Sequence, residues 1–510
     1  MPHRTEIKHF TTLPLPENLF YLSMTIGHAL FAIATVYENS KYLELPYGRT
    51  LFGFTKDTYD TEWVKWTDEL PLTVLTLLLH SVVFNLGSRV LNASTHGMLC
   101  LAFWTILHFA LYSITTLFEC FIFALVCLVT VHRLRRMEHT NCRLIGAALI
   151  WTYALIWLFM MNNTILVFDN WNASLLKAYK LFQIVSYSLV LIGEQDPLPS
   201  IRICSLELLA YCIYWPTSTI LIVPYASFRE QMTKRAPKLS PADKRRLLFM
   251  ALRVAFWTVL AEISTAFLYQ AAYMQNPDIM EDEFTSSWQY FSVAYTASQF
   301  FHTMYMSIFG IPALFASLDG LSTISFPPIC TAHASLFSKV WRYFDRGLYA
   351  FLSIHLFRPI ARVSDELGLS YRILGRLLAG ATAFVFVYLW HGASVSYYRW
   401  AMLNMLEFSL ELFGRAVWNH FDLHEQLSSH LSQRNIRRLV CLFHVPCLFI
   451  SFASITYFFG THNGATGDLI WKVFFTDRLF QLTWSGLYSI FFLYCHAQTC
   501  YELDEWVGFR

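Results

Sequence analysis

The segment LLAGATAFVFVYLW, residues 377–390, is an apolar run without a single charge that ends in His391-Gly392. Because roughly 20 mostly apolar residues cross a bilayer core of about 30 Å, this run and its flanks predict a membrane span near residues 374–392. An ionisable residue at the end of such a span is costly unless it faces a cavity or a partner. The residues alone leave two interpretations of His391 open, a catalytic group and a satisfied histidine at the membrane interface.

The whole chain has the composition of a protein that crosses a membrane many times. Of its 510 residues, 55% are hydrophobic and only 14% are charged, whereas soluble domains contain about 25% charged residues. Further spans are predicted near residues 19–37, 70–88, 97–115, 117–131, 144–161, 178–193, 247–273, 288–316, 400–416, 439–460 and 479–498. The first of them lacks a convincing signal-peptide cleavage site and is expected to stay as a helix. The sequence therefore predicts an all-α polytopic membrane protein with about 10–12 transmembrane helices, built as one membrane-embedded domain over residues 1–510.

The charged residues between the spans predict the orientation. Lys and Arg near span ends collect on the cytosolic side of a membrane. Basic stretches lie at residues 133–136, 234–246 and 434–438, and they alternate with acidic or glycosylation-sequon stretches at residues 57–69, 162–174 and 278–283. This alternation predicts that both termini are cytosolic.

The apolar stretch 204–226 does not fit the alternation as a crossing, and it contains Pro216 and Pro224. It is predicted to be a re-entrant or in-plane segment, which is tolerated at membrane depth only where its backbone is buried in protein or lines a cavity. Downstream, Ser240-Pro241 predicts a helix that starts with an N-cap serine and a proline in its first turn.

Several classes of function are not indicated. A net charge of +2 does not favour nucleic-acid binding, and the 11 cysteines contain no Cys-x-x-Cys pair. No phosphate-binding glycine loop, Gly-x-Ser-x-Gly elbow or zinc-protease spacing is present. The chemistry must therefore come from residues within or beside the spans.

The stretch 330–404 holds the candidate functional residues. Asp345 lies among Trp341, Arg342 and Arg346, and by itself suggests an ion pair at the cytosolic surface. Cys330 by itself suggests a small buried hydrophobic residue. Neither residue indicates a catalytic role without further information.

Three motifs in this stretch together resemble the Hedgehog acyltransferase branch of the membrane-bound O-acyltransferases. They are Trp-Arg-Tyr-Phe-Asp at residues 341–345, Trp-His-Gly at residues 390–392 and Ala-x-Leu-Asn at residues 401–404. Segments near residues 56–66, 211–216 and 310–320 are similar as well, so the resemblance covers most of the chain. It is closest to protein-cysteine N-palmitoyltransferases of the Rasp (skinny hedgehog) type.

The resemblance implies a helical fold around a through-membrane tunnel in the endoplasmic reticulum or Golgi membrane. Palmitoyl-CoA would enter from the cytosol, and secreted signalling proteins that begin with cysteine, of the Hedgehog type and also EGF-like ligands, would enter from the lumen. Membrane lipids would surround the helices.

For individual residues, the resemblance implies His391 as the catalytic base, Asp345 as a second catalytic residue, and Trp341 and Asn404 as substrate contacts. Inactive relatives lack the histidine that this chain keeps. Cys330 matches a haem-ligating cysteine, so the resemblance also implies haem b with a thiolate axial ligand.

Three other functions remain open at this point. A transporter would also have many spans, but internal repeats and paired charges within the membrane are not found in the sequence. A catalytically inactive relative could bind secreted clients as a regulator. Another branch of the superfamily would acylate a hydroxyl group on a lipid, a sterol or a Wnt-like protein.

Overall fold

The computed structural model describes residues 12–45, 49–137, 140–166, 170–235, 239–365, 369–473 and 484–507. Its long helices are α1 (Leu15–Ser40), α2 (Thr61–Val90), α3 (Ala93–Leu111), α4 (Ile114–Arg135), α5 (Thr140–Asn162), α6 (Trp171–Gly193), α9 (Pro241–Ser264), α12 (Ser287–Ile308), α17 (Leu369–Trp390), α18 (Val395–His420), α20 (Gln433–Phe459) and α22 (Trp484–Val507).

Shorter elements connect the long helices. They are α7 (Ile201–Ile213), α8 (Tyr225–Lys234), α10 (Gln270–Gln275), α11 (Pro277–Glu283), α13 (Gly310–Leu318), α14 (Phe337–Tyr343), α15 (Arg346–Leu352), α16 (Arg358–Asp365), α19 (Leu423–Ser428) and α21 (Ala465–Lys472), with the one-turn segments η1 (Trp215–Thr217), η2 (Thr331–His333) and η3 (Ser353–Phe357). Strands β1 (Thr50–Leu51) and β2 (Phe54–Thr55) form a small antiparallel hairpin in which Thr50 pairs with Thr55.

Ten helices of the described part are long and apolar enough to cross a membrane, with α12 and α13 counted together. Each predicted span overlaps one of the long helices, and the span 288–316 continues from α12 into the short helix α13. Residues 479–483, the start of the last predicted span, lie outside the described residues. The prediction of an all-α polytopic membrane protein is therefore confirmed.

Two predicted span boundaries are wrong. The predicted span 97–115 runs past Leu111, because Ser113 caps α4 by accepting a hydrogen bond from the Thr116 backbone N–H at 3.1 Å. The predicted span 247–273 is too long, because helix α9 ends at Ser264. The chain turns there and starts α10, whose backbone N–H groups donate to the buried Asp57 carboxylate at 2.9 and 3.0 Å. In contrast, the predicted start of α9 is confirmed, because Ser240 forms a capping box with Asp243.

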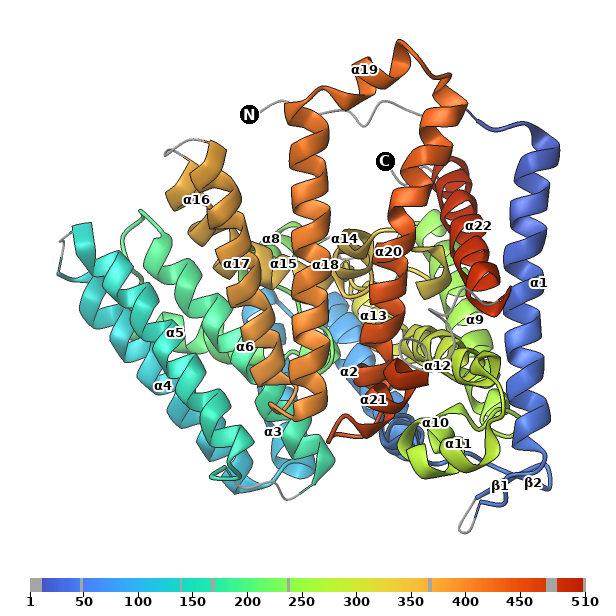
Figure 1. Ribbon diagram of the computed structural model, residues 1–510. Coiled ribbons are helices and arrows are strands. Elements are labelled where there is room, and N and C mark those ends of the chain that lie inside the picture. Colours follow the sequence, from blue (N-terminus) through green and yellow to red (C-terminus); the bar gives the residue numbers. More distant parts are fainter. Residues whose placement is uncertain are drawn as a thin grey trace.

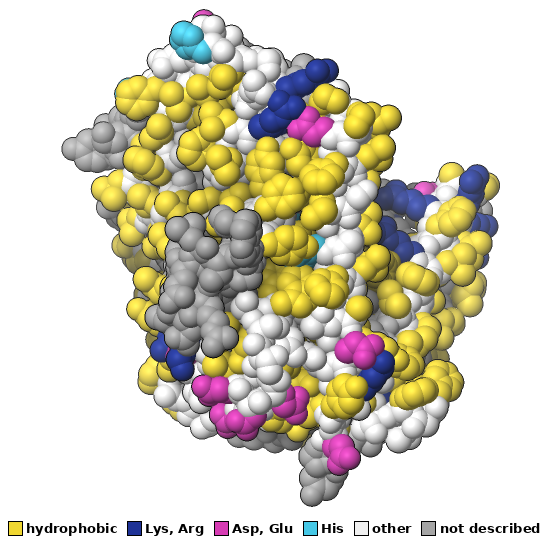
Figure 2. All heavy atoms as spheres, turned by 45° about the vertical axis from the view of Figure 1, so that its right-hand side comes forward, with side chains coloured by type: hydrophobic (Ala, Val, Ile, Leu, Met, Phe, Trp, Pro, Cys, Tyr) yellow, Lys and Arg dark blue, Asp and Glu magenta, His cyan; other side chains and the backbone are white. Residues whose placement is uncertain are grey.

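The helices pack in a continuous series across the molecule (Figure 1). Helices α4, α5 and α6 form one side, while α17, α18 and α20 cross the front and lead to α22, α1, α12 and α9 on the other side. Helix α1 begins and α22 ends at the same end of the bundle, where α16 and α19 also lie, and the β-hairpin, α10 and α11 lie at the opposite end. On the face shown in Figure 2, hydrophobic side chains cover the middle, several Lys and Arg side chains lie toward the upper end, and most Asp and Glu side chains lie toward the lower end.

The segment predicted to be re-entrant, residues 204–226, is not one long helix. It contains most of α7, which has 13 residues, then η1 and an irregular stretch up to Pro224. Two side chains of α6 satisfy its buried backbone carbonyls. The Lys180 ammonium donates to the carbonyls of Cys212 and Ser218, and the Gln183 amide donates to those of Tyr211 and Thr217.

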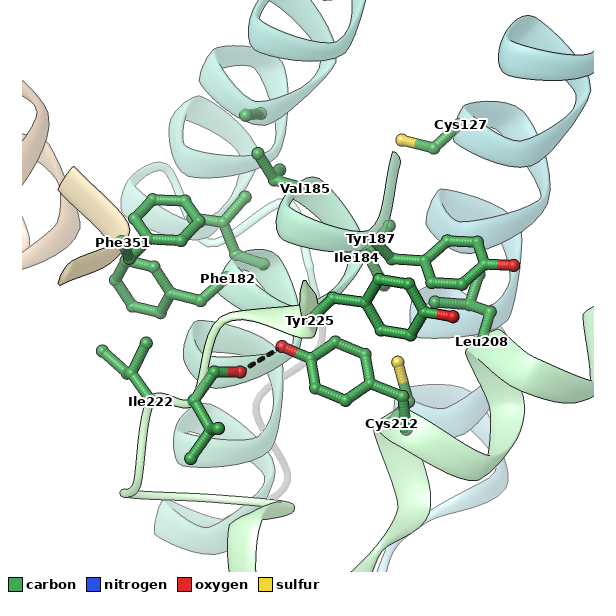
Figure 3. Close-up of a cluster of buried hydrophobic side chains, with 14 of the residues drawn as sticks. Cys127, Phe182, Ile184, Val185, Tyr187, Leu208, Cys212, Ile222, Tyr225 and Phe351 are labelled. Carbon is green, nitrogen blue, oxygen red and sulfur yellow. Dashed lines mark hydrogen bonds between the residues drawn. The ribbon is translucent and has the colours of Figure 1, made fainter. Parts of the chain in front are cut away.

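These bonds meet the requirement that irregular backbone inside a membrane protein be hydrogen-bonded by protein groups. The surrounding side chains form one buried cluster (Figure 3), in which Phe182 of α6 packs on Phe351 of α15 and Tyr187 packs on Tyr225. The re-entrant placement of this segment stays a prediction.

Candidate active site

A cavity of about 280 Å³ lies among α12, α14, α18, α20 and α22. Four of the five predicted site residues line it: His391, Asp345, Trp341 and Asn404. Its other walls are mostly apolar and aromatic. The structure therefore brings residues from separate parts of the stretch 330–404 to one cavity, and Cys330 is not among those that line it.

The His391 side chain is held at the end of α17 by a left-handed turn. Gly392 has φ +104° and Ala393 has φ 57°, and the Ala393 N–H donates back to the Tyr388 carbonyl at 3.2 Å. A glycine is favoured at such a helix end because it has no Cβ. The Trp-His-Gly sequence thus ends the span and turns the chain directly after the histidine.

The imidazole of His391 is surrounded by aromatic rings. Ring centroids lie at 4.8 Å for Trp390, 5.2 Å for Tyr397, 5.5 Å for Trp400 and 5.5 Å for Phe458. No hydrogen bond between this ring and another side chain is found in the described part of the chain. Apolar surroundings disfavour the charged imidazolium, so they keep the resting ring neutral, the form that can accept a proton.

Asp345 caps helix α15 and faces the same cavity. Its Oδ1 accepts hydrogen bonds from the Leu348 N–H at 3.0 Å and the Ser325 hydroxyl at 3.2 Å, and that hydroxyl accepts in turn from the Gly347 N–H at 3.1 Å. No ion pair of Asp345 is found among the described side chains, so the simple alternative of a surface ion pair finds no support. Burial raises the pKa of Asp345, which lies outside the candidate spans, to about 6, although its hydrogen bonds oppose this shift.

Asp345 and His391 do not hydrogen-bond to each other within the described residues, although both line the cavity. Tyr179 of α6 also lines the cavity and packs on Trp390 at 5.7 Å. Tyr305 of α12 lines it as well, and its hydroxyl donates to Glu62 Oε1 at 2.9 Å. The sequence analysis did not select these two tyrosines.

Trp341 and Asn404 connect α14 to α18. The Trp341 indole N–H donates to Asn404 Oδ1 at 3.0 Å, and the Asn404 amide donates to the Trp400 carbonyl at 2.6 Å. Because Trp400 also contacts His391, this pair fixes part of the wall against which the histidine lies. Both residues are therefore placed to shape the cavity as well as to contact a substrate.

A second cavity, of about 390 Å³, shares Phe337 and Trp341 with the first. Three arginines line it, Arg342, Arg376 and Arg415. Guanidinium groups bind phosphates well because their donors form a planar fork. This arginine pocket is suited to an anionic group attached to a chain that continues past Trp341.

Cys330 does not have the surroundings expected for a haem ligand. Its half-buried thiol faces the Gln299 side-chain oxygen at 3.8 Å, and burial raises the pKa of the thiol. Haem ligation needs the thiolate, which burial disfavours. Among the residues that the structure describes, no group of three or more His, Cys, Asp or Glu side chains could hold a metal ion. The haem b assignment thus stays a prediction without structural support.

Gly347 lies at the closest approach between α15 and the irregular segment before α8. A Cβ atom added there would overlap the carbonyl oxygen of Ile222 and would lie 2.8 Å from Ser325 Oγ.

Because the Ser325 hydroxyl holds both Asp345 and the Gly347 N–H, Gly347→Ala is expected to displace Asp345. We expect the rate of any reaction at this site to fall by more than about tenfold, since small misplacements of reacting groups are costly. Gly97→Ala, at a helix position with no atom within 4 Å of the added Cβ, is the control and is expected to keep activity; equal rates for the two variants would contradict this role of Gly347.

Comparisons with known proteins define the class of this protein. Residues 136–455 match the model of MBOAT, the membrane-bound O-acyltransferase family, and the chain belongs to this family. Over 300 residues it is 30% identical to the protein-cysteine N-palmitoyltransferase HHAT of Mus musculus, in an alignment covering 57% of this chain and 56% of that protein. Over 292 residues it is 26% identical to the protein-cysteine N-palmitoyltransferase Rasp of Drosophila melanogaster, covering 56% of this chain and 54% of that protein. The matched part thus spans little more than half the length of either relative.

Proposed function

We propose that this protein transfers palmitate from palmitoyl-CoA to the α-amine of the amino-terminal cysteine of secreted signalling proteins of the Hedgehog type, with EGF-like ligands as further clients. The observation that carries the proposal is the mostly apolar cavity that is lined by both His391 and Asp345 in a chain of the O-acyltransferase family. The two palmitoyltransferase relatives support the choice of protein-cysteine acceptors.

In this reaction the amine attacks the thioester carbonyl, the carbon–sulfur bond breaks, and an amide and free CoA are formed. An α-amine has a pKa near 8 and is mostly protonated at neutral pH, so proton removal is the main chemical problem. His391 would take the proton from the attacking nitrogen and pass it to the leaving sulfur. The neutral imidazole can accept this proton, and its apolar surroundings favour the release of the proton to sulfur.

The other site residues would bind and orient. Asp345, with its carboxylate fixed by Ser325 and the α15 backbone, would order the cytosolic side of the reacting centre. The arginine pocket would hold the phosphates of CoA, and Trp341 would lie between the phosphates and the thioester. The aromatic and aliphatic walls would accept the palmitoyl chain, whose burial is favourable at about 0.8 kcal/mol per methylene group.

The proposed site of action is the endoplasmic reticulum or Golgi membrane, with both termini in the cytosol. The basic residues Arg434, Arg437 and Arg438 at the start of α20 lie at the same end as the beginning of α1, and α11 with its acidic residues lies at the other end. The positive-inside bias supports a cytosolic assignment of the first end. The acceptor would then approach from the side of α10 and α11.

An acceptor series tests the proposed chemistry. The purified protein is incubated with palmitoyl-CoA and peptides that begin with cysteine, serine or acetylated cysteine. We expect stable amide formation with the free cysteine terminus and a loss of at least about 100-fold on acetylation, because the blocked nitrogen is no longer a nucleophile. The serine peptide separates direct amine attack, which keeps amide formation, from initial attack by the thiol.

Stable acylation of the acetylated peptide through a hydroxyl, or of a lipid or sterol alone, would replace this proposal with an O-acylating function. A protein that binds clients but transfers nothing would be an inactive regulator.

A further inference from the structure

Helix α18 presents one row of side chains to both cavities. Residues three or four apart lie on the same helix face, and this face carries Trp400, Asn404, Glu407, Glu411 and Arg415. Asn404 and Glu407 line the main cavity, whereas Glu411 and Arg415 line the arginine pocket. At a rise of about 1.5 Å per residue, Glu407 lies about 10 Å along the helix from Trp400, the residue in contact with His391. The row therefore leads from the reacting centre toward the arginines.

Glu407 differs from Glu411, the next acid in the row, because one of its carboxylate oxygens has no hydrogen-bond partner among the described residues. The residue is 0% exposed. Its Oε1 accepts a hydrogen bond from the Ser451 hydroxyl of α20, while its Oε2 has no partner among the described residues. In contrast, Glu411 is bonded to Ser338 and Arg415. A buried polar atom without a hydrogen bond is costly, and Glu407 lines the main cavity, so this oxygen is placed to bond a polar group of a ligand there.

The parts of an acyl-CoA donor differ in what they could offer to this oxygen. The palmitoyl chain has no hydrogen-bonding group, and the phosphates are anions that match the arginines instead. The pantetheine arm between them carries two amides, each with an N–H and a carbonyl. The amide nearer to sulfur would lie beside Trp400 and His391, and the farther amide would lie farther along α18.

We propose that Glu407 is a specificity-determining residue that hydrogen-bonds the farther amide of the pantetheine arm. The inference rests on the acyl-CoA donor of the proposed function and does not depend on its acceptor. A carboxylate would accept from the amide N–H, and a protonated carboxyl would donate to the amide carbonyl. The same contact would exclude a hydrocarbon chain from this position and so set the direction in which the donor binds.

A pair of donors tests this contact on the purified full chain. Palmitoyl-CoA has the whole arm, and palmitoyl-N-acetylcysteamine keeps the thioester and the nearer amide only. We expect Glu407→Leu to weaken palmitoyl-CoA binding about tenfold and binding of the truncated donor less than about twofold, as for one lost hydrogen bond to a ligand. Glu407→Gln, which keeps a donor and an acceptor, is expected to stay within about threefold of wild type for both donors.

The thermal stability of Glu407→Leu separates a donor contact from a purely structural role. If Glu407 contacts the donor, Glu407→Leu is expected to keep or raise the Tm in detergent, because replacing a buried, partly paired acid by an apolar residue of similar volume is often neutral or stabilising. Ser451→Ala removes the bond to α20 but keeps the carboxyl, and it is expected to retain the preference for palmitoyl-CoA. Equal weakening of both donors, no weakening of either, or loss of the preference in Ser451→Ala would overturn the assignment.

Two results with the wild-type protein distinguish a failure of the proposed function from a failure of the Glu407 contact. A wild-type protein that binds palmitoyl-CoA in preference to the truncated donor, yet acylates no cysteine peptide, would overturn the acceptor reaction alone. A wild-type protein that binds neither donor would overturn both proposals.

Discussion

His391→Ala is expected to lower palmitoyl transfer by about 10²–10⁴-fold, the range that general acid–base catalysis contributes. The imidazole lines the cavity, has no structural hydrogen bond to another side chain in the described residues, and is enclosed by rings that can close around a smaller residue. Binding of palmitoyl-CoA is therefore expected to change little. The measurement is the rate of amide formation on a cysteine-terminal peptide, together with the dissociation constant for the donor.

His420→Ala is the matched control, because His420 lies at the exposed end of α18, away from the cavity. It is expected to keep full activity and a normal Tm. If His391→Ala also keeps activity within a few-fold of wild type, His391 is an interfacial histidine and the base must be sought elsewhere.

Asp345→Asn is expected to cost at least about 100-fold in transfer, through loss of the fixed negative charge in the reacting centre. Asparagine is as good an N-cap as aspartate, so α15 and the bond from the Leu348 N–H are expected to persist. The substitution therefore separates charge from capping. The readouts are kcat, the KM for palmitoyl-CoA and the Tm.

Asp345→Ala completes this comparison, because it removes the cap as well and is expected to lose about 1 kcal/mol more of stability. Should Asp345→Asn behave like wild type while only Asp345→Ala is impaired, Asp345 is a structural cap without a role in transfer.

Much of the fold could be predicted from the sequence, because the length and apolar character of a span are set locally by the thickness of the bilayer. The cap at Ser240 was also predictable, because capping depends on a few adjacent residues. The early end of α9 was not predictable from adjacent residues. The chain that follows Ser264 is held by Asp57, a residue distant in sequence whose carboxylate binds the start of α10.

The candidate site was predictable in its motif residues but not in its geometry. The resemblance implied roles for Asp345 and His391, but their spacing in the sequence does not place them in one cavity, since that depends on how separate helices pack, as at the Trp341–Asn404 bond between α14 and α18. Glu407 carried a usable signal, an acid inside the predicted span 400–416. Ser325 carried none, because its role is visible only through its two hydrogen bonds.

The central claim is that the protein transfers palmitate to the nitrogen of an amino-terminal cysteine, with His391 as the base that accepts the proton of the attacking amine. The most direct measurement is tandem mass spectrometry of such a peptide after incubation with palmitoyl-CoA and the purified protein, before and after hydroxylamine treatment. We expect palmitate on the α-nitrogen, resistant to hydroxylamine, with wild type and only a trace with His391→Ala. Palmitate found solely on oxygen, or the same amide product with His391→Ala, would contradict the account.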